Sequence, residues 1–221
     1  MVYRPQTHLE TRGIILGTTP VRDADLIITL LSPNLGKISC VARSVRGSKK
    51  RFLGGFDLFD AGNFKLSRAN NQDGLYNISS VQEREPWPAL RQNLAKFSSA
   101  IYCLEVAAGF AADGDGLAGD LYGPLFGSLR LINRAGRDPE VLAIAIFFNL
   151  LALRLSGYNL VESPQAALEY PTCFAWFEAM TADNQVIVPH EPVLLQQGFV
   201  AVRSFTEQIL GRKLRSAHDL G

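Results

Sequence analysis

The spacing of apolar residues changes near residue 85, and this change constrains the fold more than any other feature of the sequence. Before it, short β-rich segments alternate with turn signals such as SPNLG (32–36) and NNQDG (70–74), a pattern typical of strands and tight turns. After it, apolar residues recur at three- and four-residue steps, as on one face of a helix. The sequence therefore predicts an α+β protein with an all-β first part and a helical second part.

Five strands are expected in the first part. Five short strands in about eighty residues, with a long connection between the third and the fourth, fit a closed barrel of the OB type better than an open sheet, which would leave unpaired edges. We therefore expect an OB-fold nucleic-acid-binding domain over residues 1–83. The expected strands are Arg12–Thr18, Asp25–Leu31, Lys37–Arg43, Phe56–Ser67 and Leu75–Gln82.

A helical domain is expected over residues 84–221. Thirteen of the fifteen residues from Val141 to Leu155 are apolar, so the helix that contains them should be enclosed by the others. Asp138 stands where it would cap this helix. Between about 158 and 192 the helical signal weakens, and we expect an irregular or hairpin insertion there, followed by a last helix from near Val193.

Charge is divided unevenly along the chain. Residues 1–85 carry 12 lysines and arginines against 8 aspartates and glutamates, a net charge of +4, and residues 86–221 carry 10 against 13, a net charge of −3. The two values sum to the net charge of +1 of the whole chain. The near-neutral average thus hides a basic half and an acidic half, and a basic half is typical of proteins that bind polyanions.

The positive charge is concentrated in KISCVARSVRGSKKRF, residues 37–52, and no acidic residue occurs between Leu26 and Phe56. Alternate side chains of the expected third strand should enter the barrel, which leaves Lys37 and Arg43 outside. Cations on an outer face bind phosphates with little sequence preference, and an aromatic ring beside them can stack on a base. The expected DNA-binding residues are Lys37, Arg43, Arg46, Lys49, Lys50, Arg51 and Phe52.

Several function classes find no support in the sequence. Three cysteines at these spacings suit neither a disulfide framework nor a zinc site. The three histidines have no matching catalytic constellation, and no phosphate-cradling glycine motif occurs. We therefore expect a protein that is not an enzyme and has no cofactor or metal. The amino-terminal residues do not resemble a secretory signal, and the longest apolar run is short for a bilayer span. These features predict a cytoplasmic protein with no membrane partner, and DNA binding would make it nucleoid-associated.

Five segments together resemble the RecO family of recombination mediators. The stretch from RGIILG at residue 12 to KKRF at residue 52 is similar to the family's amino-terminal barrel. Four later segments agree in order with family motifs: IYCLEV (101–106), PLFGSLRLI (124–132), FNLLALRLSGY (148–158) and LGRKLRS (210–216). Asn149 stands where the family usually has glutamate. Many members also carry two CxxC pairs after the GY position, where this chain has only Cys173, so a zinc site is not expected.

The resemblance implies a DNA repair function without catalysis. It implies a protein that binds single- and double-stranded DNA, anneals complementary strands coated with single-strand-binding protein (SSB), and cooperates with RecR to load RecA. It also implies that an apolar groove of the helical domain holds the acidic, phenylalanine-ended tail of SSB. The corresponding residues here are Phe148, Leu151 and Leu155 for the aromatic end and Arg154 for a carboxylate.

An adaptor is the alternative function. In this interpretation the basic loop docks an acidic protein partner, and the helical half provides a second docking surface. Binding to oligonucleotides of any sequence that weakens with salt would favour the DNA function. Absence of binding at low salt would favour the adaptor.

Overall fold

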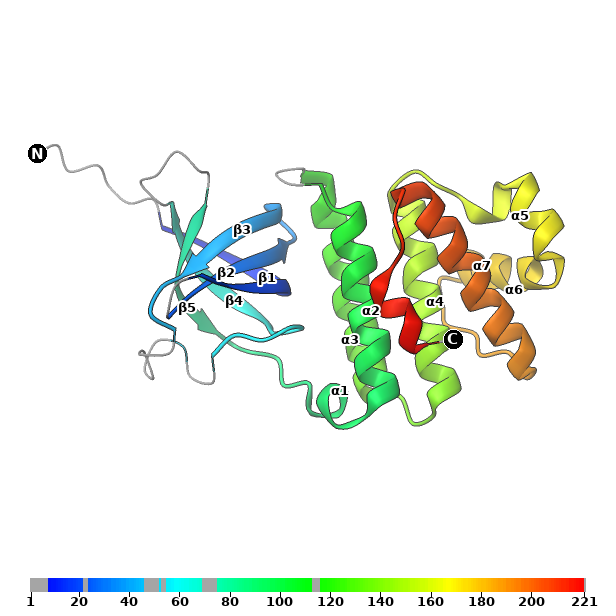
Figure 1. The fold of residues 1–221 in the computed structure, drawn as a ribbon, viewed down its shortest axis with the longest axis horizontal. Helices are drawn as coiled ribbons and strands as arrows, with labels where there is room; N and C mark the ends of the chain where they lie inside the picture. Colours follow the sequence, from blue (N-terminus) through cyan, green and yellow to red (C-terminus); the bar gives the residue numbers. More distant parts are fainter. Residues whose placement is uncertain are drawn as a thin grey trace, which may run out of the picture. The chain divides into compact units, whose positions relative to one another are not determined.

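The structure is a computed structural model that describes residues 8–21, 24–45, 52, 55–68, 75–112 and 116–220. The chain forms two compact units, one of residues 1–86 with 111–122 and one of residues 87–110 with 123–221. The first unit contains the strands and the second the main helices (Figure 1). The predicted α+β class, a β-barrel followed by a helical region, is confirmed.

Five strands of the described chain close into a barrel with the order β1-β2-β3-β5-β4. All neighbouring strands are antiparallel except β3 and β5, which are parallel. This arrangement is the OB-type barrel that the sequence predicts. The strands are β1 (His8–Val21), β2 (Asp25–Ser32), β3 (Gly36–Ala42), β4 (Ala61–Arg68) and β5 (Tyr76–Gln82).

The barrel core is apolar and draws on every strand. β1 is longer than predicted because it serves two neighbours: its first half, His8 to Ile14, pairs with β4, and its second half, from Ile14 to Val21, pairs with β2 across a register shift between Ile15 and Gly17. Gly13 lies on the crowded part of this strand, where an added Cβ would come within 2.8 Å of the Leu30 side chain. The core cluster consists of Ile15, Ile28, Leu30, Ile38, Cys40, Ala42, Phe52, Phe64, Leu66 and Ile78.

A short 3-10 helix, η1 (Gly116–Leu121), packs against β2 and β3 of the barrel unit. A Cβ added to Gly119 would lie 2.4 Å from the carbonyl oxygen of Pro33, in the turn between these strands. Only glycine permits so close an approach of two backbones. The segment 111–122 therefore belongs to the barrel unit, although a helix separates it from the barrel in the sequence.

The helical unit contains seven α-helices among its described residues. No helix in the described part of the chain is both long and apolar enough to cross a membrane. Two 3-10 segments, η2 (Leu160–Glu162) and η3 (Arg215–Asp219), complete the unit. The helices are α1 (Pro88–Gln92), α2 (Leu94–Phe110), α3 (Tyr122–Arg134), α4 (Asp138–Leu155), α5 (Pro164–Glu169), α6 (Pro171–Ala182) and α7 (Pro192–Leu210).

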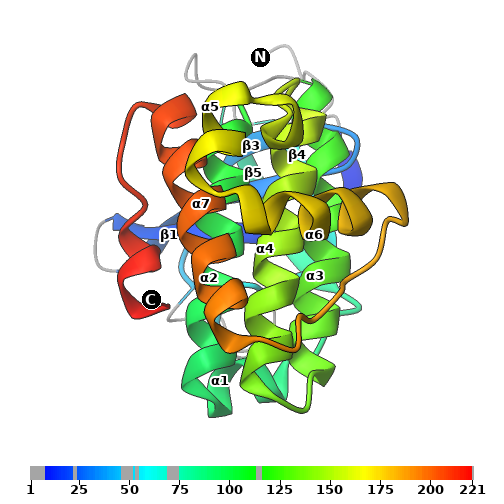
Figure 2. The same cartoon turned by 90° about the vertical axis from the view of Figure 1, so that its right-hand side faces the viewer.

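Helix α4 is the centre of this unit, as the apolar run predicts. It packs against α2, α6 and α7 (Figure 2), and most of its residues are buried. Its N-cap is Arg137 rather than Asp138, which lies in the first turn. The Glu140 carboxylate of that turn accepts a hydrogen bond from the Gly136 N–H (3.0 Å). Acidic side chains still stabilise the positive end of the helix dipole, but they belong to the first turn and not to the N-cap position.

The expected hairpin between residues 158 and 192 is absent: the structure describes this backbone throughout and contains α5 and α6 there instead of strands. Trp176 of α6 explains how the segment is held. Its Nε1–H donates to the carbonyl of Ile187 (2.8 Å), and its ring occupies the space where Gly198 of α7 lacks a side chain. Helix α6 therefore packs directly on α7, and the following chain is fastened to the Trp176 indole.

Candidate nucleic-acid interface

The side chains of β3 alternate between the barrel core and its outer surface. Ile38, Cys40 and Ala42 are buried in the core, whereas Lys37 on the opposite face is half-buried. Burial raises the pKa of the Cys40 thiol to about 12, so this cysteine stays protonated and unreactive at neutral pH. The strand thus separates an inert apolar face from the face expected to meet DNA.

The middle of this outer face is uncharged. In the register of the sheet, Val41 is opposite Ile27 and Ser39 is opposite Thr29, and directly opposite residues project from the same face. Thr19 of β1 continues the row beside Ile27. The middle of the surface over β1, β2 and β3 therefore offers hydroxyl and β-branched side chains, and charged residues such as Lys37 and Asp25 lie at the strand ends.

The strand registers bring three connections to one end of the barrel. β1 ends where β2 begins, at the pair Val21 and Asp25, and the start of β2 lies beside the end of β3. Parallel pairing of Cys40 with Tyr76 adds the start of β5 to this end, and Arg68, the last residue of β4, lies opposite Tyr76. We call this side of the barrel the Arg43 end, because the chain leaves β3 there.

Two described arginines mark the Arg43 end. Arg43 and Arg68 are both exposed, and Arg68 lies two strand spacings from β3, about 10 Å across the sheet. Lys37 lies at the other end of β3, about 20 Å away along the strand, next to the turn that contains Pro33. The structure therefore places Arg43 near an arginine that sequence reasoning missed and separates it from Lys37, although both were expected in one site.

The chain turns sharply after β3, and its direction is fixed by two hydrogen bonds. Ser44 has a left-handed backbone (φ 54°). Its N–H donates to the Asp25 carboxylate (2.8 Å), and the Val45 N–H donates to the Ala24 carbonyl (2.8 Å). Asp25 therefore anchors the base of the basic loop. The loop residues predicted to bind DNA, Arg46, Lys49, Lys50 and Arg51, lie outside the described residues.

Phe52 does not occupy the position that base stacking requires. Its side chain is 2% exposed and belongs to the barrel core, where its ring centroid lies 4.9 Å from that of Phe56. The Arg84 guanidinium lies over the Phe56 ring (5.3 Å). The prediction that Phe52 stacks on a base is corrected by this burial, because neither face of the ring is open to a ligand in this structure.

Most other cations of the described barrel have acidic partners. Lys65 forms an ion pair with Glu10 (3.0 Å), and Arg84 forms one with Asp60 (3.7 Å). These pairs reduce the positive field on the β4 side of the barrel. The cationic character is therefore strongest where the acid-free stretch of the sequence and the Arg43 end coincide.

The predicted groove of the helical unit is present in part. Leu151, Arg154 and Leu155 line an open groove of about 690 Å³ between α3 and α4. Phe148 does not line it, because this side chain is fully buried. Phe147, one residue earlier, takes its place, since it lies on the same helical face as Leu151 and Leu155. The prediction for Phe148 was wrong, because the phenylalanine on the groove-facing side of α4 is the preceding residue, Phe147.

Helix α3 supplies the opposite wall of the groove, which sequence reasoning missed. Leu131 is 46% exposed and faces Leu155, which is 50% exposed, across the groove. The signal was present in the segment PLFGSLRLI, whose apolar residues are too numerous for one buried face. The groove therefore combines exposed leucines with one arginine, Arg154, at its rim.

Known proteins resemble the chain over most of its length. Residues 7–87 match the family model described as "Recombination protein O N terminal". The proteins named "DNA repair protein RecO" from Syntrophus aciditrophicus and Desulforudis audaxviator are 30% and 31% identical over 152 and 150 residues. These matches cover 69% and 68% of this chain, but 56% and 57% of the relatives. The chain thus spans little more than half the length of these curated relatives.

A further relative covers more of the sequence. The protein named "DNA repair protein RecO" from Geobacter sulfurreducens is 27% identical over 165 residues, which is 74% of this chain and 65% of that protein. Such a match extends beyond the barrel and includes part of the helical unit. The sequence similarity therefore covers both units in part.

Proposed function

The chain belongs to the RecO family, and from this premise we propose that it is a DNA-binding recombination mediator that acts in DNA repair without catalysing a reaction. The observation that carries the proposal is the Arg43 end of the barrel. There the acid-free stretch from Leu26 to Phe56 leaves the sheet beside the exposed Arg43 and Arg68. Cations at the end of a barrel of this type suit a phosphate backbone.

The proposed surface is compatible with binding to both single- and double-stranded DNA. Arginine and lysine neutralise phosphates in either form, and phosphate contacts carry no sequence information. The uncharged face with Ile27, Thr29, Ser39 and Val41 lies beside them and can contact sugars or bases without repelling the backbone. Annealing requires only that two strands be held with reduced repulsion while their base edges stay free, so no catalytic group is needed.

The groove between α3 and α4 is proposed to hold the acidic tail of SSB. In this proposal an aromatic side chain packs against the exposed Leu131 and Leu155, which line the groove, and a remaining N–H of Arg154 pairs with a carboxylate. Docking of this tail would bring the protein to SSB-coated strands. Cooperation with RecR and assistance to RecA loading follow from family membership and complete the proposed function.

The central test is annealing of complementary strands coated with SSB, with and without the protein. Acceleration by the protein supports the mediator function, and an unchanged rate contradicts it. An SSB that lacks its acidic tail serves as the matched control, because it separates recruitment through the groove from annealing itself. If tail removal leaves the acceleration unchanged, the groove is not the SSB site.

Charge reversal of the loop tests the DNA surface directly. Replacing Lys49, Lys50 and Arg51 with glutamate should weaken binding to a random-sequence oligonucleotide by at least about tenfold. The melting temperature should stay nearly unchanged, because cations in a loop generally contribute little to folding. A titration over a range of salt concentrations also separates the adaptor alternative, which predicts no DNA binding even at low salt.

A further inference from the structure

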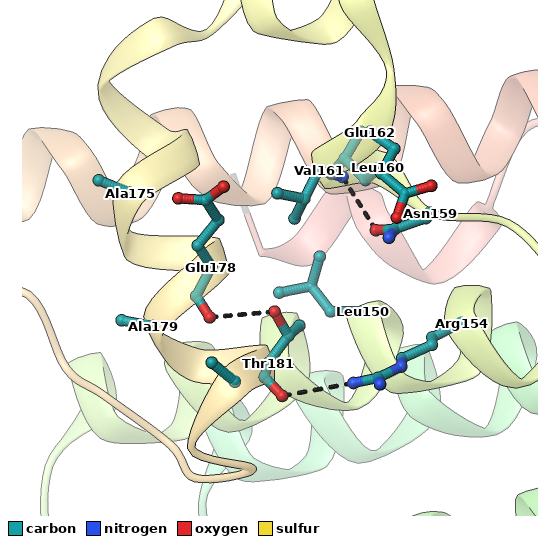
Figure 3. Close-up of a pocket in the computed structure, with 11 residues that line it drawn as sticks. Leu150, Arg154, Asn159, Leu160, Val161, Glu162, Ala175, Glu178, Ala179 and Thr181 are labelled. Atoms are coloured by element: carbon teal, nitrogen blue, oxygen red, sulfur yellow. Dashed lines mark hydrogen bonds between the residues drawn. The ribbon is translucent and has the colours of Figure 1, made fainter.

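A second pocket of the helical unit has the opposite charge preference to the groove. It has a volume of about 800 Å³ and lies between the end of α4, the segment 159–162 and α6. Figure 3 shows its walls: Glu178 from α6 on one side and Glu162 on the other, with Leu150 and Val161 between them. We call it the Glu162–Glu178 pocket.

The floor of this pocket is apolar. Leu150 and Leu160 are buried beneath it, and Val161, Ala175 and Ala179 line its sides. A pocket of this size admits two or three side chains of a peptide. The two alanines keep it open, because larger side chains at these positions of α6 would fill it.

Some polar groups at the rim of the pocket already form hydrogen bonds within the chain, and others do not. The Arg154 guanidinium donates to the Thr181 carbonyl (3.4 Å), and the Asn159 side-chain oxygen accepts from the Val161 N–H (3.2 Å). By contrast, the carboxylates of Glu162 and Glu178 accept no hydrogen bond and form no ion pair within the part of the chain that the structure describes. The pocket is lined by two carboxylates and one cation, Arg154, so the sum of its formal charges is negative.

We propose that the Glu162–Glu178 pocket docks a protein segment in which a lysine or arginine stands next to an aliphatic residue. Such a segment matches both features of the pocket. The aliphatic residue and the methylene stem of the cation cover the apolar floor, while the charged head reaches a carboxylate at the rim. This site lies in a different unit from the proposed DNA surface and shares Arg154 with the groove, but the proposal does not depend on the ligand of either.

Charge complementarity excludes the two ligands proposed for the other surfaces. A phosphate backbone or an acidic tail would bring negative charge against Glu162 and Glu178, which is unfavourable at short range. Arg154 lines both this pocket and the groove, so it marks the boundary between a surface for acidic segments and one for basic segments. The helical unit would then hold two partners of opposite charge on adjacent surfaces.

The first experiment measures the binding of two labelled peptides to the full chain by fluorescence anisotropy. One peptide alternates leucine with lysine, and the other has glutamate in place of each lysine. We expect saturable binding of the lysine peptide. Replacing both Glu162 and Glu178 with glutamine should weaken it by roughly three- to tenfold, the range for two exposed charge contacts. Tighter binding of the glutamate peptide at this pocket would overturn the proposal.

Matched variants separate a specific site from general attraction to an acidic surface. Glu178→Gln and Glu191→Gln each remove one exposed carboxylate, but Glu191 lies outside the pocket at the start of α7. Only Glu178→Gln should weaken binding. Equal weakening by both variants would mean non-specific attraction and would reject the site.

A filling variant tests the cavity independently of charge. Ala179→Phe should abolish binding of the lysine peptide while the far-ultraviolet circular dichroism and DNA binding stay unchanged. Unaltered binding in this variant would overturn the proposal. Sedimentation equilibrium of the wild-type chain tests whether a second copy of the chain occupies the pocket. A dimer that is lost in the Glu162→Gln, Glu178→Gln double variant would contradict the proposal that the ligand is a segment of a different protein.

Discussion

The barrel and the helical unit differ in the interactions that connect their secondary-structure elements. In the barrel, backbone hydrogen bonds join the strands into a closed ladder, and the outward side chains take little part. Among the described helices of the second unit, no backbone ladder joins one helix to another, and buried side chains connect them. Asn149 of α4 donates to the Tyr102 hydroxyl of α2 and accepts from the Thr206 hydroxyl of α7.

This difference determines where each unit has room for function. A sheet whose backbone supplies the connections can vary the residues on its outer face, so the barrel is free to carry a phosphate-binding end. A helical bundle that depends on buried side chains can vary only its exposed grooves and pockets. The predictions below test this contrast, beginning with the residues whose loss should cost most.

Asn149 should be the most sensitive position of the helical unit. Asn149→Ala leaves the buried Tyr102 hydroxyl and Thr206 hydroxyl without their partner and creates a small cavity. We expect the free energy of unfolding to fall by about 2–4 kcal/mol. Denaturant unfolding followed by circular dichroism measures this change.

The barrel offers the matched control for this loss. Ser39→Ala removes a half-buried hydroxyl from the outer face of β3 and should change the free energy of unfolding by less than about 0.5 kcal/mol. Comparable losses in the two variants would break the contrast between the units.

Gly119 tests the tight backbone contact of the barrel unit. A Cβ at this position would collide with the Pro33 carbonyl oxygen, so Gly119→Ala should lower the free energy of unfolding by about 1–3 kcal/mol. Gly123→Ala is the control, because open space surrounds Gly123 in α3. The control should be neutral or slightly stabilising, by up to about 1 kcal/mol. Thermal melts of both variants provide the comparison, and an unchanged melt for Gly119→Ala would refute a required close approach.

Glu105 connects stability to pH in the helical unit. Burial tends to raise the pKa of its carboxyl group, but hydrogen bonds from Ser216, the Arg215 N–H and Arg212 outweigh burial and lower it. A carboxyl whose pKa is lower in the folded state stabilises the protein above the unfolded value, about pH 4.3, and this contribution is lost as the pH falls through the folded value.

Glu105→Gln should therefore destabilise the protein by about 1–2 kcal/mol at pH 7. The difference from the wild type should shrink below about pH 4. Unfolding curves at pH 7 and pH 3 measure both values. A difference that is the same at the two pH values would contradict a role for the ionised carboxylate.

The two ends of β3 provide the smallest and sharpest comparison. Arg43→Ala and Arg68→Ala should each weaken DNA binding by roughly three- to fivefold, as expected for the loss of one phosphate contact, whereas Lys37→Ala at the other end should have less effect. Oligonucleotide titrations at a fixed salt concentration measure all three. A larger effect for Lys37 would move the interface to the opposite end of the barrel.

Much of the fold was predictable because its signals are local. The alternation of β3 follows from the period of two in a strand, and the sequence around Val141–Leu155 indicates a central helix because few other structures bury so long an apolar run. The hairpin expected between 158 and 192 was wrong because the signal there depends on Trp176 and Gly198, which are distant in sequence. The local turn signal around TADNQ favoured a hairpin, but the contact between Trp176 of α6 and Gly198 of α7 stabilises a helical arrangement instead.

The candidate sites divide in the same way. The concentration of cations near residue 43 is evident in the sequence, since it is a run without acidic residues. Strand order and register decide three further features: Arg68 lies at the same barrel end as these cations, Lys37 lies at the opposite end, and Phe52 is buried. Likewise, the choice between Phe147 and Phe148 depends on the rotation of α4 about its axis, which neighbouring helices fix.

The sequence by itself determined the division into a β-rich basic part and a helical acidic part, because composition and hydrophobic period are properties of each segment alone. Only the tertiary structure decided which charged and apolar side chains meet. The parallel pairing of β3 with β5 brings Arg68 to the same end of the barrel as Arg43, and the packing of α6 beside α4 forms the pocket that Glu162 and Glu178 line. These contacts are made by residues that are far apart in the chain. They form only when burial of the core fixes the strands and helices of each unit against one another.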